Sequence, residues 1–186
     1  MKSFIRFGTQ FAGSRLVTHL EEKEWLLSQV REQNGGGSRM ATRLLFKFDP
    51  LNSTNFHRYI DQKENLLLVV ELQNGYKIGG YCKGALERGK PNMSGKGFLF
   101  SLSPNVAYLP KKEARDKQAL VTYDDYFLIF GSSELRIKSL ELKLFSNFGL
   151  QTSLFEARGT KVQEYLGVNG NEVGINHYEI FQIVAE

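Results

Sequence analysis

Residues 66–82 read Leu66-Leu67-Leu68-Val69-Val70-Glu71-Leu72-Gln73-Asn74-Gly75-Tyr76-Lys77-Ile78-Gly79-Gly80-Tyr81-Cys82, and they carry the clearest fold signal in the sequence. Two apolar runs of strand length flank Asn74-Gly75, and Asn-Gly favours positive φ at both central residues of a type I′ turn. The stretch is therefore predicted to form a β-hairpin. Two adjacent glycines inside the second run, Gly79 and Gly80, indicate a bulge or the close approach of another backbone.

Further short strands are predicted on both sides of this hairpin, with turn residues between them. They span residues 43–48, 98–102, 119–123, 126–130, 135–137, 140–145 and 177–184. In the first of them, Leu44, Phe46 and Phe48 alternate and are expected on one face. This spacing is typical of an antiparallel sandwich rather than of alternating βαβ units.

Two helices are predicted around the first strand. Thr18-His19-Leu20-Glu21 has the pattern of a capping box, so the first helix is expected over residues 18–33. Its apolar face would hold Leu20, Trp25, Leu26, Leu27 and Val30, while Glu22, Lys23 and Glu24 stay solvated. A short second helix after Asn52 or Ser53 would bury Phe56, Tyr59 and Ile60. The predicted class is mainly β with short helices (α+β), a two-sheet antiparallel β-sandwich flanked by helices.

The chain has 186 residues, of which 41% are hydrophobic, enough for one core and too few for two comfortable domains. We expect an N-terminal arm over residues 1–17, the helix over 18–33, a Gly-rich linker over 34–41 and the sandwich over 42–186. We also expect deletion of residues 1–17 to leave thermal unfolding nearly unchanged.

The arm is basic and aromatic, and residues 1–20 hold no Asp or Glu. Its basic residues are Lys2, Arg6 and Arg15, and its apolar residues are Phe4, Ile5, Phe7 and Phe11. Such a segment is typical either of a mitochondrial transit peptide or of a docking tail. As a tail, it would use the apolar residues as anchors and the basic residues against an acidic surface.

The sequence offers little support for catalytic chemistry. It has no Gly-x-x-x-x-Gly-Lys-Ser/Thr loop, no dinucleotide fingerprint and no Gly-x-Ser-x-Gly elbow with suitable partners, so we expect no cofactor. His19, His57 and His177 lack metal-site spacing, and Asp124, Asp125 and Glu134 fit hairpin turns better than an acid–base pair. We expect one nitrogen of His57 to be bonded to the backbone.

The single cysteine, Cys82, cannot form an internal disulfide, which favours a reducing, intracellular setting. We interpret it as a half-buried strand residue, with a redox-sensitive thiol as the alternative. The net charge of +4 does not by itself imply nucleic acid, and no apolar run is long enough for a membrane helix. In the exposed loop expected over residues 84–97, Arg88 and Lys90 either contact an acidic partner or are simply solvated.

Several segments, taken in order, resemble the TLDc domain of eukaryotic oxidation-resistance proteins. They are Leu44-Leu45-Phe46-Lys47-Phe48, Asn55-Phe56-His57, Asn74-Gly75-Tyr76-Lys77-Ile78-Gly79-Gly80-Tyr81, Gly97-Phe98-Leu99-Phe100-Ser101-Leu102, Phe130-Gly131-Ser132-Ser133-Glu134-Leu135-Arg136-Ile137, Ser146-Asn147-Phe148-Gly149 and Tyr178-Glu179-Ile180-Phe181. The resemblance implies a two-sheet sandwich with short helices and an interaction module, notably one that binds the V-ATPase. The chain departs from the family at Ser132-Ser133-Glu134, where a Gly-rich turn and an Asp are common, and at Ile60, where a Cys is common.

From these observations we expect a non-enzymatic structural or interaction protein docked in a large assembly, most specifically a microtubule or axonemal complex with tubulin or axonemal partners. Regulation of the V-ATPase is the alternative, and protection against peroxides through Cys82 is a third. The expected partner contacts are Lys2, Phe4, Ile5, Arg6, Phe7, Phe11, Arg15, Arg88 and Lys90. We expect a cytoplasmic location, at the cytoskeleton or ciliary axoneme, with the mitochondrion as a minor alternative.

Overall fold

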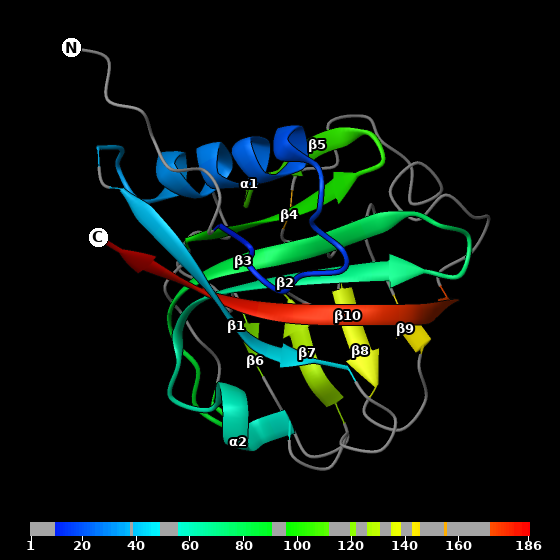
Figure 1. Ribbon diagram of the computed structural model, residues 1–186. Coiled ribbons are helices and arrows are strands. Elements are labelled where there is room, and N and C mark those ends of the chain that lie inside the picture. Colours follow the sequence, from blue (N-terminus) through cyan, green and yellow to red (C-terminus); the bar gives the residue numbers. More distant parts are fainter. Residues whose placement is uncertain are drawn as a thin grey trace.

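A computed structural model describes residues 10–37, 39–48, 56–90, 96–111, 120–121, 126–130, 135–138, 143–145, 155 and 172–186 of the chain. Strands dominate, and they form a large antiparallel sheet and a smaller second sheet (Figure 1). The helix α1 (Leu20–Gln33) lies across one face of the large sheet, and the small sheet lies on the other side (Figure 1). The predicted class, a mainly β sandwich with short helices, is confirmed.

The large sheet has the order β5-β4-β3-β2-β10, with β1 on the other side of β10. The small sheet has the order β9-β8-β7-β6. The elements after α1 are β1 (Met40–Lys47), α2 (Phe56–Ile60), β2 (Glu64–Leu72), β3 (Lys77–Ala85), β4 (Gly97–Leu102), β5 (Asn105–Tyr108), β6 (Leu120–Val121), β7 (Tyr126–Phe130), β8 (Leu135–Lys138), β9 (Lys143–Phe145) and β10 (Glu172–Ala185).

The last strand, β10, links the two sheets. Glu172, Val173 and Gly174 pair with β9 of the small sheet, whereas the rest of β10 pairs with β2 and β1 of the large sheet. This strand is longer at its N-terminal end than the predicted span of 177–184, because its first residues serve the second sheet. A single continuous backbone thus fixes how the layers sit relative to one another.

The central hairpin is confirmed, although its turn differs from the predicted type. Strand pairing closes at Leu72 and Tyr76, where the Leu72 N–H donates to the Tyr76 carbonyl at 2.8 Å, and a three-residue loop separates them. Only Gly75 has positive φ, at 83°. The loop is therefore a type I turn followed by a left-handed glycine. The Gln73 N–H donates to the Gly174 carbonyl at 2.9 Å, which ties the loop to β10.

The glycine pair in β3 marks close approach, as predicted, and not a bulge. Pairing with β2 and β4 is regular at Gly79 and Gly80. A Cβ on Gly79 would run into the carbonyl oxygen of Leu68, and one on Gly80 would lie 2.7 Å from the Phe130 ring of the small sheet. Gly80 therefore lets the Phe130 ring of the small sheet approach the large sheet, and Gly79 leaves room for the Leu68 carbonyl and the Phe100 ring of its own sheet.

Both faces of the large sheet are buried, which explains the unbroken apolar run in β2. Leu67 and Val69 face α1, whereas Leu66, Leu68 and Val70 face the small sheet. The helix-side cluster also contains Phe11, Leu26, Leu27, Val30, Tyr81, Phe98, Phe100 and Phe181. The cluster between the sheets contains Phe56, Ile60, Ile78, Cys82, Leu99, Phe130, Ile137, Tyr178 and Ile180. A strand buried on both faces has no polar alternation.

The first strand contradicts the expected single apolar face. The register of β1 against β10 shifts between Leu44 and Phe46, so Leu45 is an extra residue in a β-bulge. As a result Leu44 packs with the helix-side cluster, and Phe46 and Phe48 pack between the sheets. Because a bulge adds one residue to the strand, side chains after it point to the opposite face from the one that strict alternation predicts.

The predicted capping box at Thr18 is wrong. The helix α1 begins at Leu20 with His19 at the N-cap, and no side chain caps it. The His19 carbonyl accepts the first helical hydrogen bond, from Lys23 at 3.2 Å. Leu16 and Val17 are buried just before this turn, so core packing sets the entry of the chain into the helix.

Three side chains of the predicted helices also lie elsewhere than expected. Leu20 is 53% exposed and Tyr59 is 46% exposed, so neither belongs to a buried face. Glu22, expected in solvent, is partly buried and accepts a hydrogen bond from Lys77 Nζ of β3 at 2.9 Å. This ion pair joins α1 to the central hairpin.

The boundaries expected from the sequence are approximate. The predicted linker over 34–41 ends early because Met40 and Ala41 already pair with Val184 and Ala185 of β10. The small-sheet strands β6 and β9 are assigned over fewer residues than predicted, and residues 122–125 and 139–142 lie outside the described residues. None of the described helices is long and apolar enough to cross a membrane.

Candidate functional site

The chain between Gln10 and Val17 packs onto its own sheet. The Phe11 ring is 2% exposed and meets Phe181 of β10 edge-on, with ring centroids 5.0 Å apart. The Phe11 N–H donates to the Thr42 hydroxyl, and the Gln10 side-chain amide donates to the Met40 carbonyl at 3.2 Å. Because β1 is an edge strand, these contacts cover part of its unpaired side.

Glu179 of β10 holds this segment in place. Its carboxylate is 2% exposed and accepts hydrogen bonds from the Ser14 hydroxyl at 2.5 Å and from the Arg15 N–H at 2.9 Å. The Leu16 N–H lies 3.5 Å from the same carboxylate, and Lys47 Nζ of β1 lies 3.7 Å away. Several donors and one cation therefore replace the water that a buried carboxylate loses.

This packing corrects the role expected for Phe11. The ring lies in the core of its own domain, so it cannot serve as an apolar anchor for a partner. Arg15 is exposed, although its backbone is fixed by Glu179. The other five expected contacts in the arm lie outside the described residues: Lys2, Phe4, Ile5, Arg6 and Phe7. Residues 10–17 therefore belong to the folded domain.

The loop after β3 carries the other two expected contacts, and both are exposed. Lys90 Nζ bonds to the Glu87 carboxylate at 2.6 Å, and this contact raises the pKa of Lys90. Leu86, between β3 and the exposed residues, is fully buried and anchors the loop to the core. Glu87 thus partly neutralises the positive charge of Lys90 within the loop. Arg88 is exposed beside this pair.

The side chains of Cys82 and His57 both have surroundings other than those expected from the sequence. Cys82 is 1% exposed, more buried than expected, and packs between the sheets. His57 Nδ1 lies 3.0 Å from the Asp61 carboxylate, a side-chain partner where a backbone one was expected. Among the described residues, no group of three or more His, Cys, Asp or Glu could hold a metal ion. Asp124, Asp125 and Glu134 lie outside the described residues.

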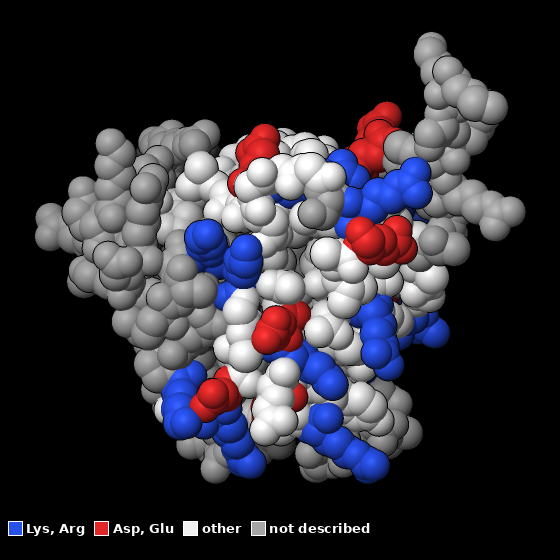
Figure 2. Space-filling view, turned by 90° about the vertical axis from the view of Figure 1, so that its left-hand side faces the viewer, with Lys and Arg blue, Asp and Glu red and all other residues white. Residues whose placement is uncertain are grey.

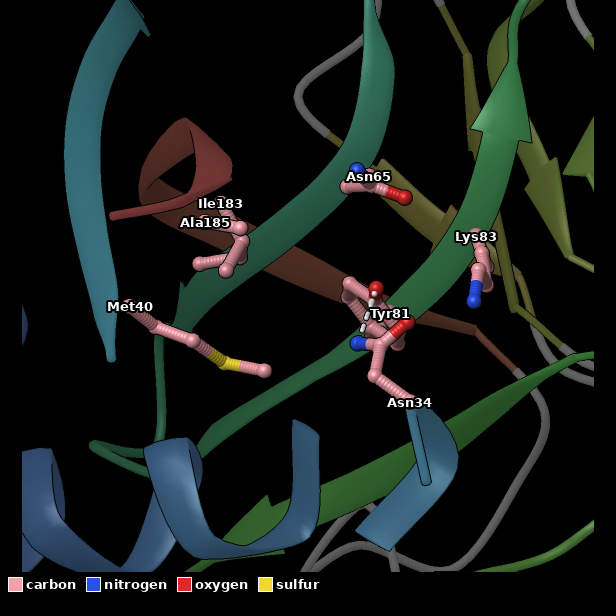
Figure 3. Close-up of a pocket in the computed structure, with 7 residues that line it drawn as sticks. All are labelled: Asn34, Met40, Asn65, Tyr81, Lys83, Ile183 and Ala185. Carbon is pink, nitrogen blue, oxygen red and sulfur yellow. Dashed lines mark hydrogen bonds between the residues drawn. The ribbon is translucent and has the colours of Figure 1, made fainter. Parts of the chain in front are cut away.

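A cavity of about 240 Å³ lies on the helix side of the large sheet, just beyond the C-terminal end of α1 (Figure 3). It opens where β1 and β2 begin and where β3 and β10 end. Its lining residues are Asn34, Met40, Asn65, Tyr81, Lys83, Ile183 and Ala185. Met40, Ile183 and Ala185 form an apolar side, and the other four residues are polar.

The polar side of the cavity is built around Tyr81. Its side chain is 1% exposed, and its hydroxyl oxygen accepts a hydrogen bond from Asn34 Nδ2 at 2.9 Å (Figure 3). Asn34 Nδ2 also donates to the Val30 carbonyl at 2.9 Å. Burial raises the pKa of Tyr81 to about 12, so the hydroxyl keeps its proton at neutral pH.

On the face shown in Figure 2, basic and acidic side chains interleave. The Lys83 N–H donates to the Lys96 carbonyl at 3.0 Å, which brings two basic residues to adjacent strands. The Glu186 N–H donates to the Arg39 carbonyl at 2.9 Å, which places the last residue beside the start of β1. The end of the sheet is therefore mixed in charge.

Sequence reasoning missed both Glu179 and Tyr81 as organising residues. A single acid inside the apolar run Tyr178-Glu179-Ile180-Phe181 was the available signal for Glu179, because a buried carboxylate requires donors. The donors come from Ser14 and the residues after it, more than 160 positions away along the chain. Tyr81 gave no comparable signal, since a tyrosine in a strand is ordinary.

Comparison with known proteins agrees with the resemblance noted from the motifs. No curated protein matches the chain. A family model described as TLDc domain matches residues 17–184, nearly the whole chain and all of the large sheet except its last residue, Ala185. TLDc domains serve in general as protein-interaction and regulatory modules. With a match of this extent and a sandwich of the expected class, the chain belongs to the TLDc domain family.

Proposed function

We propose that this protein is a non-enzymatic interaction module that docks into a large assembly through the segment before Gln10. The observation that carries the proposal is the attachment of residues 10–17 at Glu179 and Phe181. This attachment gives the preceding residues a fixed starting point on the domain. Those residues combine Lys2 and Arg6 with Phe4, Ile5 and Phe7 and contain no acid.

The specific assembly we propose is a microtubule or axonemal complex. An acid-free segment with apolar anchors is complementary to an acidic protein surface, and the microtubule presents one. Arg15, Arg88 and Lys90 are exposed and would add peripheral contacts, which affect association rate more than affinity. We accordingly propose a cytoplasmic location at the cytoskeleton or cilium.

Regulation of the V-ATPase is the second candidate, and family membership favours it. The TLDc match covers the helix α1 and the sandwich but not the first 16 residues, so this function would use the sandwich itself. The two candidates therefore differ in which part of the chain carries the binding. Protection against peroxides through Cys82 is less favoured, because a thiol that is 1% exposed is poorly accessible to oxidants.

Co-sedimentation with microtubules tests the arm directly. The full chain is compared with a variant lacking residues 1–9 and with a double variant, Lys2→Glu and Arg6→Glu, which keeps the apolar residues. We expect the full chain to pellet with microtubules and both variants to bind at least about tenfold more weakly. Deletion of residues 1–17 is unsuitable as a test, because it removes the buried Phe11, Leu16 and Val17.

Three results decide between the candidates. Undiminished pelleting of the variant lacking residues 1–9, with its thermal unfolding intact, contradicts docking through the arm. Failure of the full chain to pellet contradicts the microtubule proposal. In that case, enrichment of V-ATPase peripheral subunits by the full chain and by the shortened variant alike supports the second candidate. Fluorescence microscopy of the tagged full chain distinguishes a cytoskeletal location from a mitochondrial one.

A further inference from the structure

We propose that the cavity beside Tyr81 is a binding site for a carboxylate carried on a short apolar stem, either a free small molecule or the C-terminal residue of a peptide. The cavity has polar and apolar lining on opposite elements: α1, β2 and β3 supply Asn34, Asn65, Tyr81 and Lys83, and β1 and β10 supply the apolar residues. This inference is independent of the arm and of the assembly that the arm binds.

The Tyr81 hydroxyl is oriented so that its hydrogen faces the cavity without a protein acceptor among the described residues. The Val30 carbonyl and the Tyr81 oxygen both accept from Asn34 Nδ2, which fixes the amide with its nitrogen toward them. The Tyr81 oxygen therefore accepts, and its own hydrogen has no acceptor among the residues that the structure describes. A side chain that is 99% buried thus presents an unused O–H donor at the cavity. A ligand oxygen would satisfy it.

Two more polar side chains, Asn65 and Lys83, line the cavity beside that donor. Asn65 has positive φ, at 55°, at a register shift between β2 and β3, and its Oδ1 accepts the Gly84 N–H at 3.4 Å. With Oδ1 engaged, its NH₂ group is left as a donor. Lys83 lies two residues after Tyr81 on the same strand and brings a positive charge to the same end of the cavity (Figure 3). Donors and one cation favour an anionic acceptor.

The rest of the cavity is apolar and is large enough for a short hydrocarbon stem. Met40, Ile183 and Ala185 can contact only an apolar group favourably, so a bare inorganic anion would leave this side unused. About 240 Å³ corresponds to roughly eight water volumes, enough for a carboxylate on a branched stem of a few carbons. A branched aliphatic acid or the last residue of a peptide fits both sides.

The negative end of the α1 dipole lies near the cavity and opposes an anion, but the carbonyls that generate it are bonded. The Asn34 N–H donates to Val30 and Arg31, the Gly35 N–H to Glu32, and the Gly36 N–H to Arg31. The Asn34 side chain adds a further bond to Val30. Lys83 lies at the cavity with the opposite charge. We therefore expect weak binding, on the order of 1 mM for a fragment of this size.

The test is an NMR titration of the full chain with four probes. Two are 3-methylbutanoate and its neutral isostere 3-methylbutanamide, and two are an acetylated Ala-Ala-Leu peptide as the free acid and as the C-terminal amide. We expect saturable shifts at the backbone amides of Asn34, Asn65, Tyr81 and Lys83 with at least one of the acids. Each amide should bind at least about tenfold more weakly than its acid.

Two variants locate the site. Tyr81→Phe removes only the donor oxygen and should weaken acid binding about tenfold. Tyr178→Phe is the matched control, because its buried hydroxyl has no partner among the described residues and its ring faces the small sheet. It should bind the acid like the parent. Lys83→Met should weaken the acid more than the amide. Thermal unfolding of each variant shows whether the fold is retained.

Each outcome of the titration either supports the site or overturns the proposal. Binding by the free acid indicates a small-molecule ligand, and binding by the peptide acid alone indicates a chain terminus of a partner; both support the site. The proposal is overturned if neither acid gives saturable shifts, if acid and amide bind equally, or if the shifts lie away from the cavity. It is also overturned if a folded Tyr81→Phe variant binds the acid like the parent. The comparison of acid with amide on the unmodified protein remains decisive even if a variant fails to fold.

Discussion

A carboxylate buried in the last strand organises the beginning of the chain. Glu179 accepts hydrogen bonds from Ser14 and from the backbone after it, and Lys47 balances its charge from the neighbouring strand. A charge without water is stable only where donors converge on it. At the scale of the residue, the Glu179 side chain fixes Ser14 and Arg15 to the folded domain, although the sequence placed them in a tail.

Glu179→Gln should lower the free energy of unfolding by about 2 to 4 kcal/mol, because an amide NH₂ would face donors and Lys47 would lose its counter-charge. Ser14→Ala should cost less, since the Arg15 N–H remains bonded. Urea unfolding measures both. Glu64→Gln, at an exposed position on β2, is the control and should change stability by less than about 0.5 kcal/mol. An unchanged midpoint for Glu179→Gln would contradict the role given to this carboxylate.

At the scale of the element, the folded domain begins earlier than the sequence predicted, at Gln10 instead of Thr18. The segment from Gln10 to Val17 has no helix or strand, yet it buries Phe11, Leu16 and Val17 against the helix-side face of the large sheet. The helix that follows starts later than its sequence pattern indicates. Irregular segments become part of a core when their apolar side chains find a face that no regular element covers.

Phe11→Ala should therefore destabilise the protein by about 3 kcal/mol, since it leaves a cavity beside Phe181. Leu20→Ala is the matched control, because Leu20 was expected on the buried face of the helix but is 53% exposed. Its effect should stay within about 0.5 kcal/mol. Thermal and urea unfolding of the two variants give the comparison. Equal stability of both variants would mean that Phe11 is not a core residue in solution.

At the scale of the whole molecule, three layers bury tyrosines on both sides of the large sheet. Tyr81 lies beneath α1, and Tyr178 lies between the sheets. Burial raises the pKa of Tyr81 to about 12 and also raises that of Tyr178. Removing the proton from either hydroxyl places a charge where the fold solvates it poorly, so alkaline pH destabilises the folded domain.

Alkaline unfolding tests this arrangement. Both folded-state pKa values exceed the ordinary value of 10, so above pH 10 the folded state holds more protons than the unfolded state. The stability contribution of each group is fully present below pH 10 and is lost as pH rises through the folded pKa, at about 1.4 kcal/mol per pH unit. Urea unfolding at pH 9 and 11 should show the loss, and Tyr81→Phe should reduce it. A loss no smaller in that variant would contradict the burial of Tyr81.

Most of the strands, the central hairpin and the class of the fold could be predicted from the sequence alone, whereas the short strand β5 was not predicted. These features depend on local patterns: apolar runs of strand length, Asn74-Gly75 between them, and the Gly79-Gly80 pair, which indicated a bulge or a close approach. Their signals lie within a few residues of one another, and the motifs in order also indicated the family. Local patterning constrains local structure strongly because strand pairing across a short turn needs no distant partner.

Three features could be seen only in the folded molecule: where the domain begins, which side chains face which layer, and where a ligand could bind. Glu179 meets Ser14, Asn34 meets Tyr81, and the bulge at Leu45 forms against β10, all between segments far apart in the chain. Such contacts depend on which donors and apolar faces come together in space. The local pattern of apolar and polar residues does not contain that information. The physical reason is burial: a carboxylate or hydroxyl removed from water must find its partners wherever the fold brings them.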